Sequence, residues 1–355
     1  MIILQILCKI NFIDIINYFL IIFMVNINFN SNRKYGNICV HKYWRKYLEF
    51  KLRKYYRAIL TRSNYFDIGN FWGAKKIGFC FNGCTCTKSL IDKIYKNQDY
   101  YSESYTLNYR SLIELKNKNL NMYDNSRWIV KKDYSMQGKG IIPTTSWSQI
   151  MKLFGKSNEK FVLQKEIPPA LHNGYKFDFR QHFILIKENN NYQAYFMDYG
   201  FTRIQSNKFS KNNNNSFKTN LSGTNNKYAL YKTFLKSYDP ENYQKRKDDL
   251  INLTRKVGSK FADYIKGRNE LFFSNKPAPK YQIMIIGIDI MFDNNNKPYL
   301  IELNNVPGFL ENKRSEKLLN IEDKIMVDNI WNDVLVRWMD NKDHNMNYNK
   351  YFTRC

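Results

Sequence analysis

Acidic and amide side chains lie on two neighbouring segments near residue 290, in a pattern that could hold a divalent cation. Segments 286–292 and 299–304 are rich in strand-forming residues, and 293–298 between them has the composition of a turn. Because side chains alternate along a strand, Glu302 and Asn304 share one face, and a hairpin register can place Asp289 opposite them. Such oxygen ligands suit Mg²⁺, which also keeps water and nucleotide phosphates. The pattern therefore predicts either a magnesium site or a hairpin with ordinary solvated acids.

A second segment, 176–183, alternates charged and aromatic residues with a period of two. One strand face carries Lys176, Asp178, Arg180 and His182, and the other carries Phe177, Phe179 and Phe183. A solvated strand gives the same pattern. A face with lysine, aspartate and arginine also suits phosphate and carboxylate groups, because arginine binds them through two donors and lysine supplies a point charge.

A glycine-rich loop follows a short apolar strand at 128–130 that leads to Lys131. Gly138 and Gly140 flank Lys139, so the backbone can approach a ligand closely and turn its N–H groups toward phosphate oxygens. The spacing and the ending differ from those of a Walker A motif. A plain hairpin turn is the alternative.

The remaining pattern is mixed, with strands and helices in turn. A weak strand signal lies near 77–81, and Thr87 is expected to cap a helix over 88–95. Strands are predicted at 161–167, which Pro168 stops, and at 192–197. Residues 211–215 read as a low-complexity loop. The periodicity predicts helices over 240–266 and 315–341.

The amino-acid composition indicates which classes of binding partner to expect. The 355 residues include 56 Lys and Arg against 31 Asp and Glu, a net charge of +25. This charge favours polyanionic partners, although part of it reflects the heavy use of Lys, Ile, Tyr and Asn. The length is sufficient for two or three lobes. The six cysteines predict free thiols in a reduced compartment, because Cys80, Cys84 and Cys86 form an incomplete zinc set.

The first 62 residues contain two unusual segments. Residues 15–25 are apolar but shorter than the roughly 20 residues of a membrane span, and they lack a signal-peptide pattern. A buried or accessory segment is expected, and a membrane anchor is left open. Segment 33–62 holds ten Lys or Arg interleaved with Tyr43, Trp44, Tyr47, Tyr55 and Tyr56, which predicts a basic helix over 37–62. It would either grip polyanions or pack its aromatic rings on the domain.

These segments, in this order, resemble the tubulin–tyrosine ligase-like family, which are amino-acid ligases with an ATP-grasp core. The resemblance covers about 80–320. It rests on Trp-Ile-Val-Lys at 128–131 with the glycine-rich 137–141, on 163–167, on Lys-Phe-Asp-Phe-Arg at 176–180, on Gly-Phe-Thr-Arg at 200–203, on Thr-Asn at 219–220, and on 287–289 with 301–304 and Pro307. It implies an α/β (α+β) ATP-grasp fold whose two lobes sandwich ATP, with a small N-terminal α/β lobe and a basic helical extension.

The resemblance also implies a set of site residues. The implied metal ligands are Asp289, Glu302 and Asn304, and the catalytic residues are Lys131, Lys176, Arg180 and Arg203. The implied ATP contacts are Lys131, Gln137, Gly138, Gln164, Lys165, Glu166, Ile167, Lys176, Phe177, Asp178, Thr219 and Asn220. Arg203, assisted by Ser222, would bind the incoming amino acid. Lys88 matches the basic segment before the family's first helix.

Three single positions and one pair of residues depart from the family pattern. Lys132 stands in place of proline, Lys218 in place of leucine, and Leu221 in place of the tyrosine of glutamylating members. The pair before Gly200 also differs. Since the metal ligands and Lys131 remain, we expect an active enzyme.

The implied function is ATP- and Mg²⁺-dependent addition of an amino acid, glutamate first, to carboxylates of tubulin tails. Tyrosine or glycine addition and a non-catalytic microtubule-binding protein are the alternatives. Nucleic acid and membrane are not expected partners. The expected location is the cytoplasm and the microtubule cytoskeleton, including the cilium, flagellum or basal body. The expected domains are the extension 1–62, an N-terminal lobe 63–125, the core 126–320, and a C-terminal helix and tail 321–355.

Overall fold

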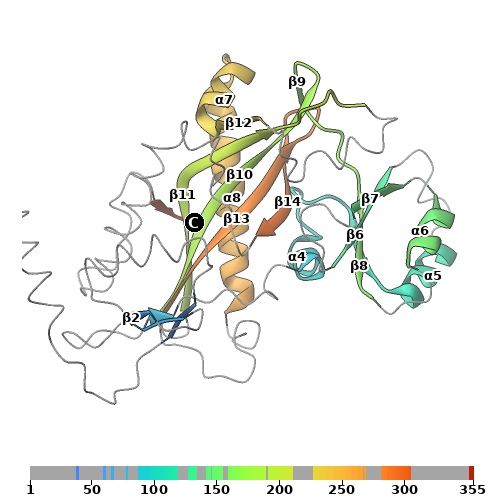
Figure 1. Cartoon of the computed structure of the whole chain (residues 1–355), viewed down its shortest axis with the longest axis horizontal. Helices are drawn as coiled ribbons and strands as arrows, with labels where there is room; N and C mark the ends of the chain where they lie inside the picture. The colour runs from blue at the N-terminus through green and yellow to red at the C-terminus, as the bar shows by residue number, and fades with distance from the viewer. Residues whose placement is uncertain are drawn as a thin grey trace, which may run out of the picture. The chain divides into compact units, whose positions relative to one another are not determined.

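The computed structural model describes most of the chain between residues 87 and 304 and a short C-terminal segment (Figure 1). The described ranges are 87–118, 127–133, 141–144, 146–154, 159–188, 191–210, 227–266, 268, 281–304 and 352–355. To these are added the short strands β1 (Asn37–Cys39), β2 (Ile59–Leu60), β3 (Tyr65–Asp67) and β4 (Ile77–Gly78). All of them belong to one compact unit that spans residues 36–355.

The larger sheet contains segment 176–183 and the two strands of the hairpin at 286–304, where metal and phosphate ligands were predicted. Its strand order is β12 (Lys227–Leu230), β11 (Asn191–Ile204), β10 (Tyr175–Glu188), β13 (Tyr281–Phe292) and β14 (Pro298–Asn304). These neighbours are antiparallel. Strand β15 (Phe352–Arg354) pairs with β11, β4 pairs in parallel with β13, and β9 (Leu171–His172) pairs with β10.

Two long strands form the centre of this sheet. The predicted strand at 192–197 continues to Ile204, because its far half pairs with β10 beyond a register shift next to Gln181 and His182. Beyond this shift, β11 includes Gly200 and Arg203. A side chain at Gly200 would meet the amide of Gln181 at 2.4 Å and the carbonyl oxygen of Arg180 at 2.7 Å. Only glycine therefore fits at this close approach.

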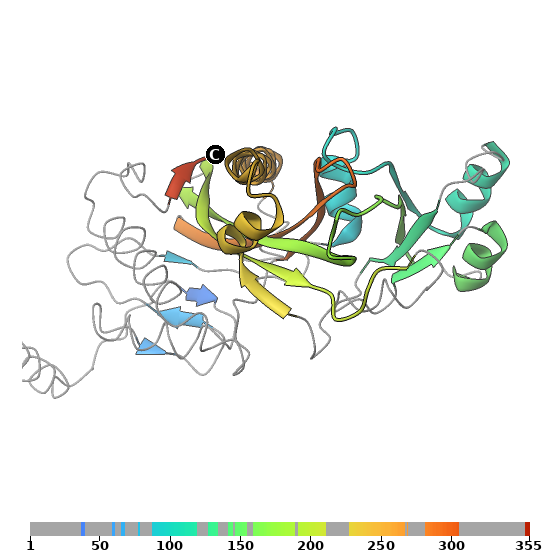
Figure 2. The same cartoon turned by 90° about the horizontal axis from the view of Figure 1, so that it is seen from above.

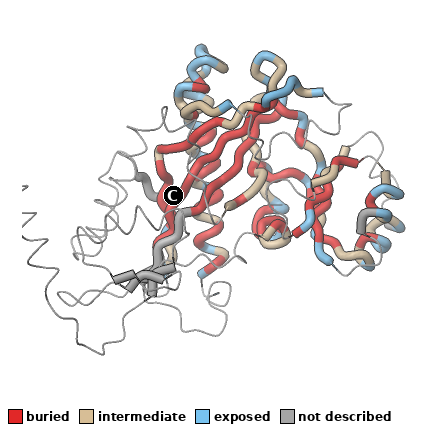
Figure 3. The backbone as a smooth tube through the Cα atoms, viewed as in Figure 1, coloured by how far each residue is buried: buried red, intermediate tan, exposed pale blue. Residues whose placement is uncertain are grey.

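Helix α8 (Tyr243–Ile265) covers one face of the larger sheet, and Figure 2 shows it nearly end-on above the strands. Its apolar residues recur every three or four positions, as the sequence periodicity predicted. Leu250, Leu253, Val257, Phe261 and Ile265 are buried in the core that includes the sheet. Helix α7 (Tyr231–Tyr238) adds Phe234, whose ring lies 4.8 Å from that of Phe177 and 5.9 Å from that of Phe179. The aromatic face of β10 is therefore core, as expected from its alternation, and the strands are buried along much of their length (Figure 3).

The smaller sheet has the order β5 (Ser104–Leu107), β8 (Phe161–Lys165), β6 (Trp128–Lys132) and β7 (Ile141–Thr144). Helices α5 (Tyr109–Lys118) and α6 (Trp147–Phe154) contribute Leu112 and Ile150 to an apolar core on one face. Trp128, Val130, Phe161 and Leu163 belong to this core. Since side chains alternate, Lys131 and Gln164 point to the opposite face.

Helix α4 (Lys88–Tyr95) contacts both sheets. Its cap is the one predicted, because the Thr87 hydroxyl accepts a hydrogen bond from the Leu90 N–H. The Tyr95 hydroxyl donates to the carbonyl of Val257 in α8 at 2.9 Å. At the other end, the Ser89 N–H donates to Asp133, which follows β6, at 2.8 Å. The helix therefore ties the smaller sheet to the layer formed by the larger sheet and α8.

The continuous basic helix predicted over 37–62 is wrong at its two described segments. Residues 37–39 and 59–60 are strands that both pair with β3. Strand pairing satisfies the backbone of the β-branched Ile38 and Ile59, a tertiary gain that overrides helical periodicity. The rest of that segment, the helix expected at 315–341, the apolar 15–25 and the glycine-rich loop lie outside the described residues. Strand β5, from the range expected as an N-terminal lobe, pairs with β8, so the predicted boundary near 125 passes through one sheet.

Candidate active site

A charged face lies opposite the α8 core on the larger sheet. Lys176, Asp178 and Arg180 come from β10, and each is at most 9% exposed. The strand pairing adds partners from the neighbours, because Asp178 faces Arg203 on β11 and Arg180 faces Asp289 on β13. The alternation that buried the phenylalanines therefore placed ionised groups side by side on the other face.

These residues form one ion-pair network. Arg180 donates to both carboxylate oxygens of Asp289, from Nε and, at 3.1 Å, from Nη2. Arg203 Nε donates to Asp178 Oδ1 at 2.5 Å, and Arg203 Nη2 lies 3.0 Å from Asp289 Oδ2. Two arginines thus bridge two buried carboxylates, with the forked geometry that arginine favours.

The protonation of the network follows from burial and from these partners. Burial alone would raise the pKa of Asp289, but Arg180 and Arg203 outweigh it and lower the pKa to about 2. Burial raises the pKa of Asp178, and the neighbouring Asp289 raises it too, which outweighs the opposite effect of Arg203 and Lys176. Burial together with Arg180 lowers the pKa of His182 to about 3, so this histidine is uncharged at neutral pH.

Glu302 and Asn304 complete the predicted oxygen set. The hairpin pairs Asp289 with Glu302 and Gly287 with Asn304, and Asn304 Nδ2 donates to Asp289 Oδ2 at 3.3 Å. Burial and the neighbouring Asp289 raise the pKa of Glu302, although Lys88 Nζ lies 4.0 Å from its carboxylate. Two adjacent carboxylates repel each other when both are ionised, and a divalent cation between them removes this repulsion. A ligand set made only of oxygen atoms fits Mg²⁺. Within the described ranges, no cluster of three or more His, Cys, Asp or Glu forms an all-protein metal cage.

Lys131 reaches the same region from the smaller sheet. Its Nζ donates to Gln164 Oε1 at 2.6 Å, while the Gln164 Nε2 is buried without a hydrogen-bond partner in the part of the chain that the structure describes. Burial lowers the pKa of Lys131 to about 8, and Lys88 and Lys176 lower it while Glu302 raises it. The charges of Glu302 and Lys176, which belong to the larger sheet, therefore influence the pKa of Lys131 on the smaller sheet.

Positive charge exceeds negative charge among the described residues of this region. Lys176 is influenced by Asp178, Glu166 and Arg127, and burial lowers its pKa. Arg127 lies 3.4 Å from Glu166. The cationic side chains are Lys88, Arg127, Lys131, Lys176, Arg180 and Arg203, and the carboxylates are Glu166, Asp178, Asp289 and Glu302. We refer to these ten residues as the charge cluster. Its surplus of cations, placed beside a possible Mg²⁺ ligand set, suits a polyphosphate.

The structure separates two expected residues from the charge cluster. Lys165, expected near the phosphates, projects to the other face of β8 and lies 3.6 Å from Glu103, half-exposed. Its neighbour Gln164 faces the cluster because consecutive strand residues point in opposite directions. The Phe177 side chain is likewise packed in the aromatic core. Only the backbone of these two residues remains available for the predicted nucleotide contacts. Ile167 is buried, and Gln137, Gly138, Thr219, Asn220 and Ser222 lie outside the described residues.

Arg127 was not among the residues predicted for the site. A basic residue directly before the strand at 128–132 was the available indication, and its carbonyl accepts a hydrogen bond from the N–H of Glu166, which follows β8. Lys88, which rested on the resemblance alone, lies within the charge cluster. Among the described residues, no helix is both long and apolar enough for a membrane crossing.

The family comparison agrees with the motifs. The model of the tubulin-tyrosine ligase family matches residues 79–342, a range that includes the charge cluster. Tubulin glycylase 3B of Tetrahymena thermophila is 27% identical over 237 residues, which make up 59% of this chain and 19% of that protein. Mouse (Mus musculus) tubulin polyglutamylase TTLL6 is 24% identical over 227 residues, 58% of this chain and 26% of that protein. The chain therefore matches about a fifth to a quarter of the length of these relatives. For the probable alpha-tubulin polyglutamylase Ttll1 of Tetrahymena thermophila, the identity is 26%, over 67% of this chain and 63% of that protein.

The comparison with solved structures concerns the fold. The C-terminal domain of K. lactis Pby1, described as an ATP-grasp enzyme that interacts with the mRNA decapping enzyme Dcp2, superposes with a TM-score of 0.57 at 16% identity. The match covers 89% of this chain and 96% of that domain. The predicted ATP-grasp fold is therefore confirmed.

Proposed function

Since the chain belongs to the tubulin-tyrosine ligase family, we propose that it is an ATP- and Mg²⁺-dependent ligase that joins an amino acid to a carboxylate of a tubulin tail. The observation that carries this proposal is the charge cluster, in which lysines from the smaller sheet and arginines from the larger one surround Asp289 and Glu302. Cationic side chains outnumber the carboxylates there and lie beside an all-oxygen ligand set, which supports the binding of a nucleotide polyphosphate with its Mg²⁺.

The residues divide into three roles in this proposal. Lys131 and Lys176 would hold the phosphates of ATP by charge, and Gln164 would donate its unpartnered Nε2 to the nucleotide. Asp289, Glu302 and Asn304 would hold Mg²⁺, which neutralises phosphate charge when bound. Because both oxygens of Asp289 already accept hydrogen bonds from arginines, these guanidinium groups must share the carboxylate with the metal or turn toward the substrates.

The bond-forming steps then need position and electrostatics more than acid–base chemistry. The acceptor carboxylate attacks the γ-phosphorus, ADP leaves, and an acyl phosphate forms. The amine of the amino acid attacks this carbonyl, loses a proton and releases phosphate, which forms the peptide or isopeptide bond. In this proposal Arg180 would stabilise the transferred phosphoryl group, and Arg203 would bind the amino acid's carboxylate. Thr219, Asn220 and Ser222 remain predicted contacts of the nucleotide and the amino acid.

We propose glutamate as the amino acid and the microtubule cytoskeleton as the place of action. TTLL6 and the probable Ttll1, both named as polyglutamylases, support glutamate. Glycine is the second candidate, because a relative named as a tubulin glycylase has 27% identity. The net charge of +25 suits an acidic acceptor in either case.

The test is incorporation of labelled glutamate, glycine or tyrosine into tubulin, with ATP and with or without Mg²⁺, read by mass spectrometry of the tails. We expect Mg²⁺-dependent addition of glutamate, its loss in Asp289→Ala, and full activity in the control Asp263→Ala, an exposed aspartate on α8. Addition of glycine alone would select the second candidate. If no residue is added although Mg·ATP binds, the chain is a binding protein on this fold and the proposal fails.

A further inference from the structure

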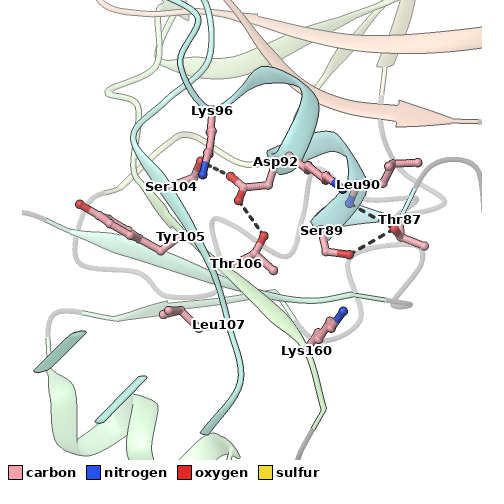
Figure 4. Close-up of a pocket in the computed structure, with 11 residues that line it drawn as sticks. Thr87, Ser89, Leu90, Asp92, Lys96, Ser104, Tyr105, Thr106, Leu107 and Lys160 are labelled. Atoms are coloured by element: carbon pink, nitrogen blue, oxygen red, sulfur yellow. Dashed lines mark hydrogen bonds between the residues drawn. The ribbon is translucent and has the colours of Figure 1, made fainter. Parts of the chain in front are cut away.

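A groove of about 500 Å³ lies between α4 and β5, on a part of α4 that the charge cluster does not use (Figure 4). Lys93 of α4, Lys96 at the C-cap of this helix and Lys160, which precedes β8, line it together with Ser104 and Thr106. Lys88 at the start of the same helix belongs to the charge cluster, so α4 connects the two regions.

The groove carries uncompensated positive charge. Its three lysines are exposed, and none forms an ion pair with another described residue. Asp92, the acid in the groove wall, is only 2% exposed and accepts hydrogen bonds from both Ser104 and Thr106. An anionic partner would therefore meet the lysines without competition from this carboxylate.

The hydroxyl groups decide which kind of anion fits. The hydrogens of Ser104 and Thr106 are donated to Asp92, and that of Ser89 is donated to Asp133 at 2.9 Å. With these hydrogens engaged, the three hydroxyl groups can offer a ligand only acceptor lone pairs, and the lysines are the main donors of the groove. A free phosphate needs donors on most sides and fits poorly. A peptide supplies main-chain N–H groups for the acceptors and acidic side chains for the lysines.

The strand that lines the groove also suits a peptide. β5 is the outermost strand of the smaller sheet as described, and four consecutive residues, 104–107, line the groove. Consecutive residues of a strand point to alternate faces. Because residues of both faces line the groove, it runs along the length of β5. An extended chain can lie along such a strand and use its main-chain groups.

We propose that the groove between α4 and β5 docks an acidic peptide segment in extended conformation, held by Lys93, Lys96 and Lys160. The inference rests on the proposed function only in naming the occupant, the acidic tail of the acceptor protein. Glutamates distant from the modified one would lie in the groove, while the modified one reaches the charge cluster past the first turn of α4.

The test is direct binding of a short fluorescent peptide of alternating glutamate and glycine to the full chain without nucleotide. The test variant is Lys93→Gln/Lys96→Gln/Lys160→Gln. The control, Lys152→Gln/Lys256→Gln/Lys266→Gln, removes the same charge at exposed positions outside the groove. We expect Kd to rise about ten-fold in the test variant, as three exposed ion pairs predict, and to change less than about two-fold in the control. Amide hydrogen exchange at 104–107 should slow when the native chain binds the peptide.

Three results would overturn the inference. Equal losses in the two variants would show that net charge alone attracts the peptide. Unchanged affinity in the test variant would place the peptide elsewhere. Equal competition by inorganic phosphate or by single-stranded RNA would mean that the groove selects charge and not a peptide. The proposed function is tested apart from this, because ATP-dependent incorporation into tubulin can persist when the peptide does not bind the groove, and the peptide can bind when incorporation fails.

Discussion

Asp289 and Glu302 face each other, and both are proposed to hold Mg²⁺, yet their replacement should affect stability in opposite ways. Asp289→Asn removes the charge that pairs with two buried arginines, whereas Glu302→Gln removes a charge that burial and Asp289 disfavour. Both variants should lose ATP-dependent turnover. Only the first should lose substantial stability.

The magnitude for Asp289 follows from its protonation. Its pKa falls from 3.8 to about 2 on folding, despite burial, because Arg180 and Arg203 stabilise the charged form. Such a change corresponds to roughly 2 kcal/mol of stability. This contribution is fully present above about pH 4 and is lost as the pH falls through about 2. Since Arg180 also loses its bidentate partner and Arg203 loses one of its two carboxylates, we expect Asp289→Asn to cost roughly 2–4 kcal/mol at neutral pH.

The ionised Glu302 side chain contributes to folding stability with the opposite sign. Its folded pKa is raised, so the ionised carboxylate opposes folding, and this penalty grows as the pH rises through the folded pKa. Glu302→Gln should therefore leave the native state as stable as before, or more stable, at neutral pH.

Urea unfolding without nucleotide, followed by tryptophan fluorescence, measures both effects, and ATP turnover is measured in parallel. The urea midpoint should fall clearly for Asp289→Asn and should stay or rise for Glu302→Gln. An Asp289→Asn variant as stable as the native chain, or a larger loss for Glu302→Gln, would refute the charge network as described.

Three further predictions follow from single contacts. Mg·ATP affinity should decline above about pH 8 as Lys131 loses its proton, and calorimetric titrations across pH should find this decline missing in Lys131→Arg. Thr87→Ala should lower stability by about 1 kcal/mol in urea unfolding through loss of the α4 cap, whereas Thr87→Ser should preserve it. Gly200→Ala should cost about 1–3 kcal/mol, because the new methyl group overlaps the Gln181 amide and a backbone carbonyl; an unchanged thermal midpoint would contradict this close approach.

Local patterns in the sequence determined the parts of the site that lie on one strand or one hairpin. Alternation along β10 predicted which side chains would be charged neighbours and which would be core, because the two faces of a strand are fixed by its geometry. The turn composition at 293–298 predicted the hairpin that carries Asp289 and Glu302, although a register shift between Asp289 and Ile290 is what places these two residues opposite each other. The N-cap of α4 and the periodicity of α8 were likewise readable, since both depend on contacts within a few residues.

Tertiary structure decided what no local pattern encodes. Arg203 meets Asp178 and Asp289 only because β11, β10 and β13 lie side by side in the sheet, at separations of many residues. Lys165 pairs with Glu103, Arg127 enters the charge cluster, and residues 37–39 and 59–60 become strands, each through partners supplied by distant segments. The sequence thus determined the chemistry that each strand offers. The sheet order and the packing of the two sheets around α4 determined which charges meet, because Coulomb interactions depend on distance in space and not along the chain.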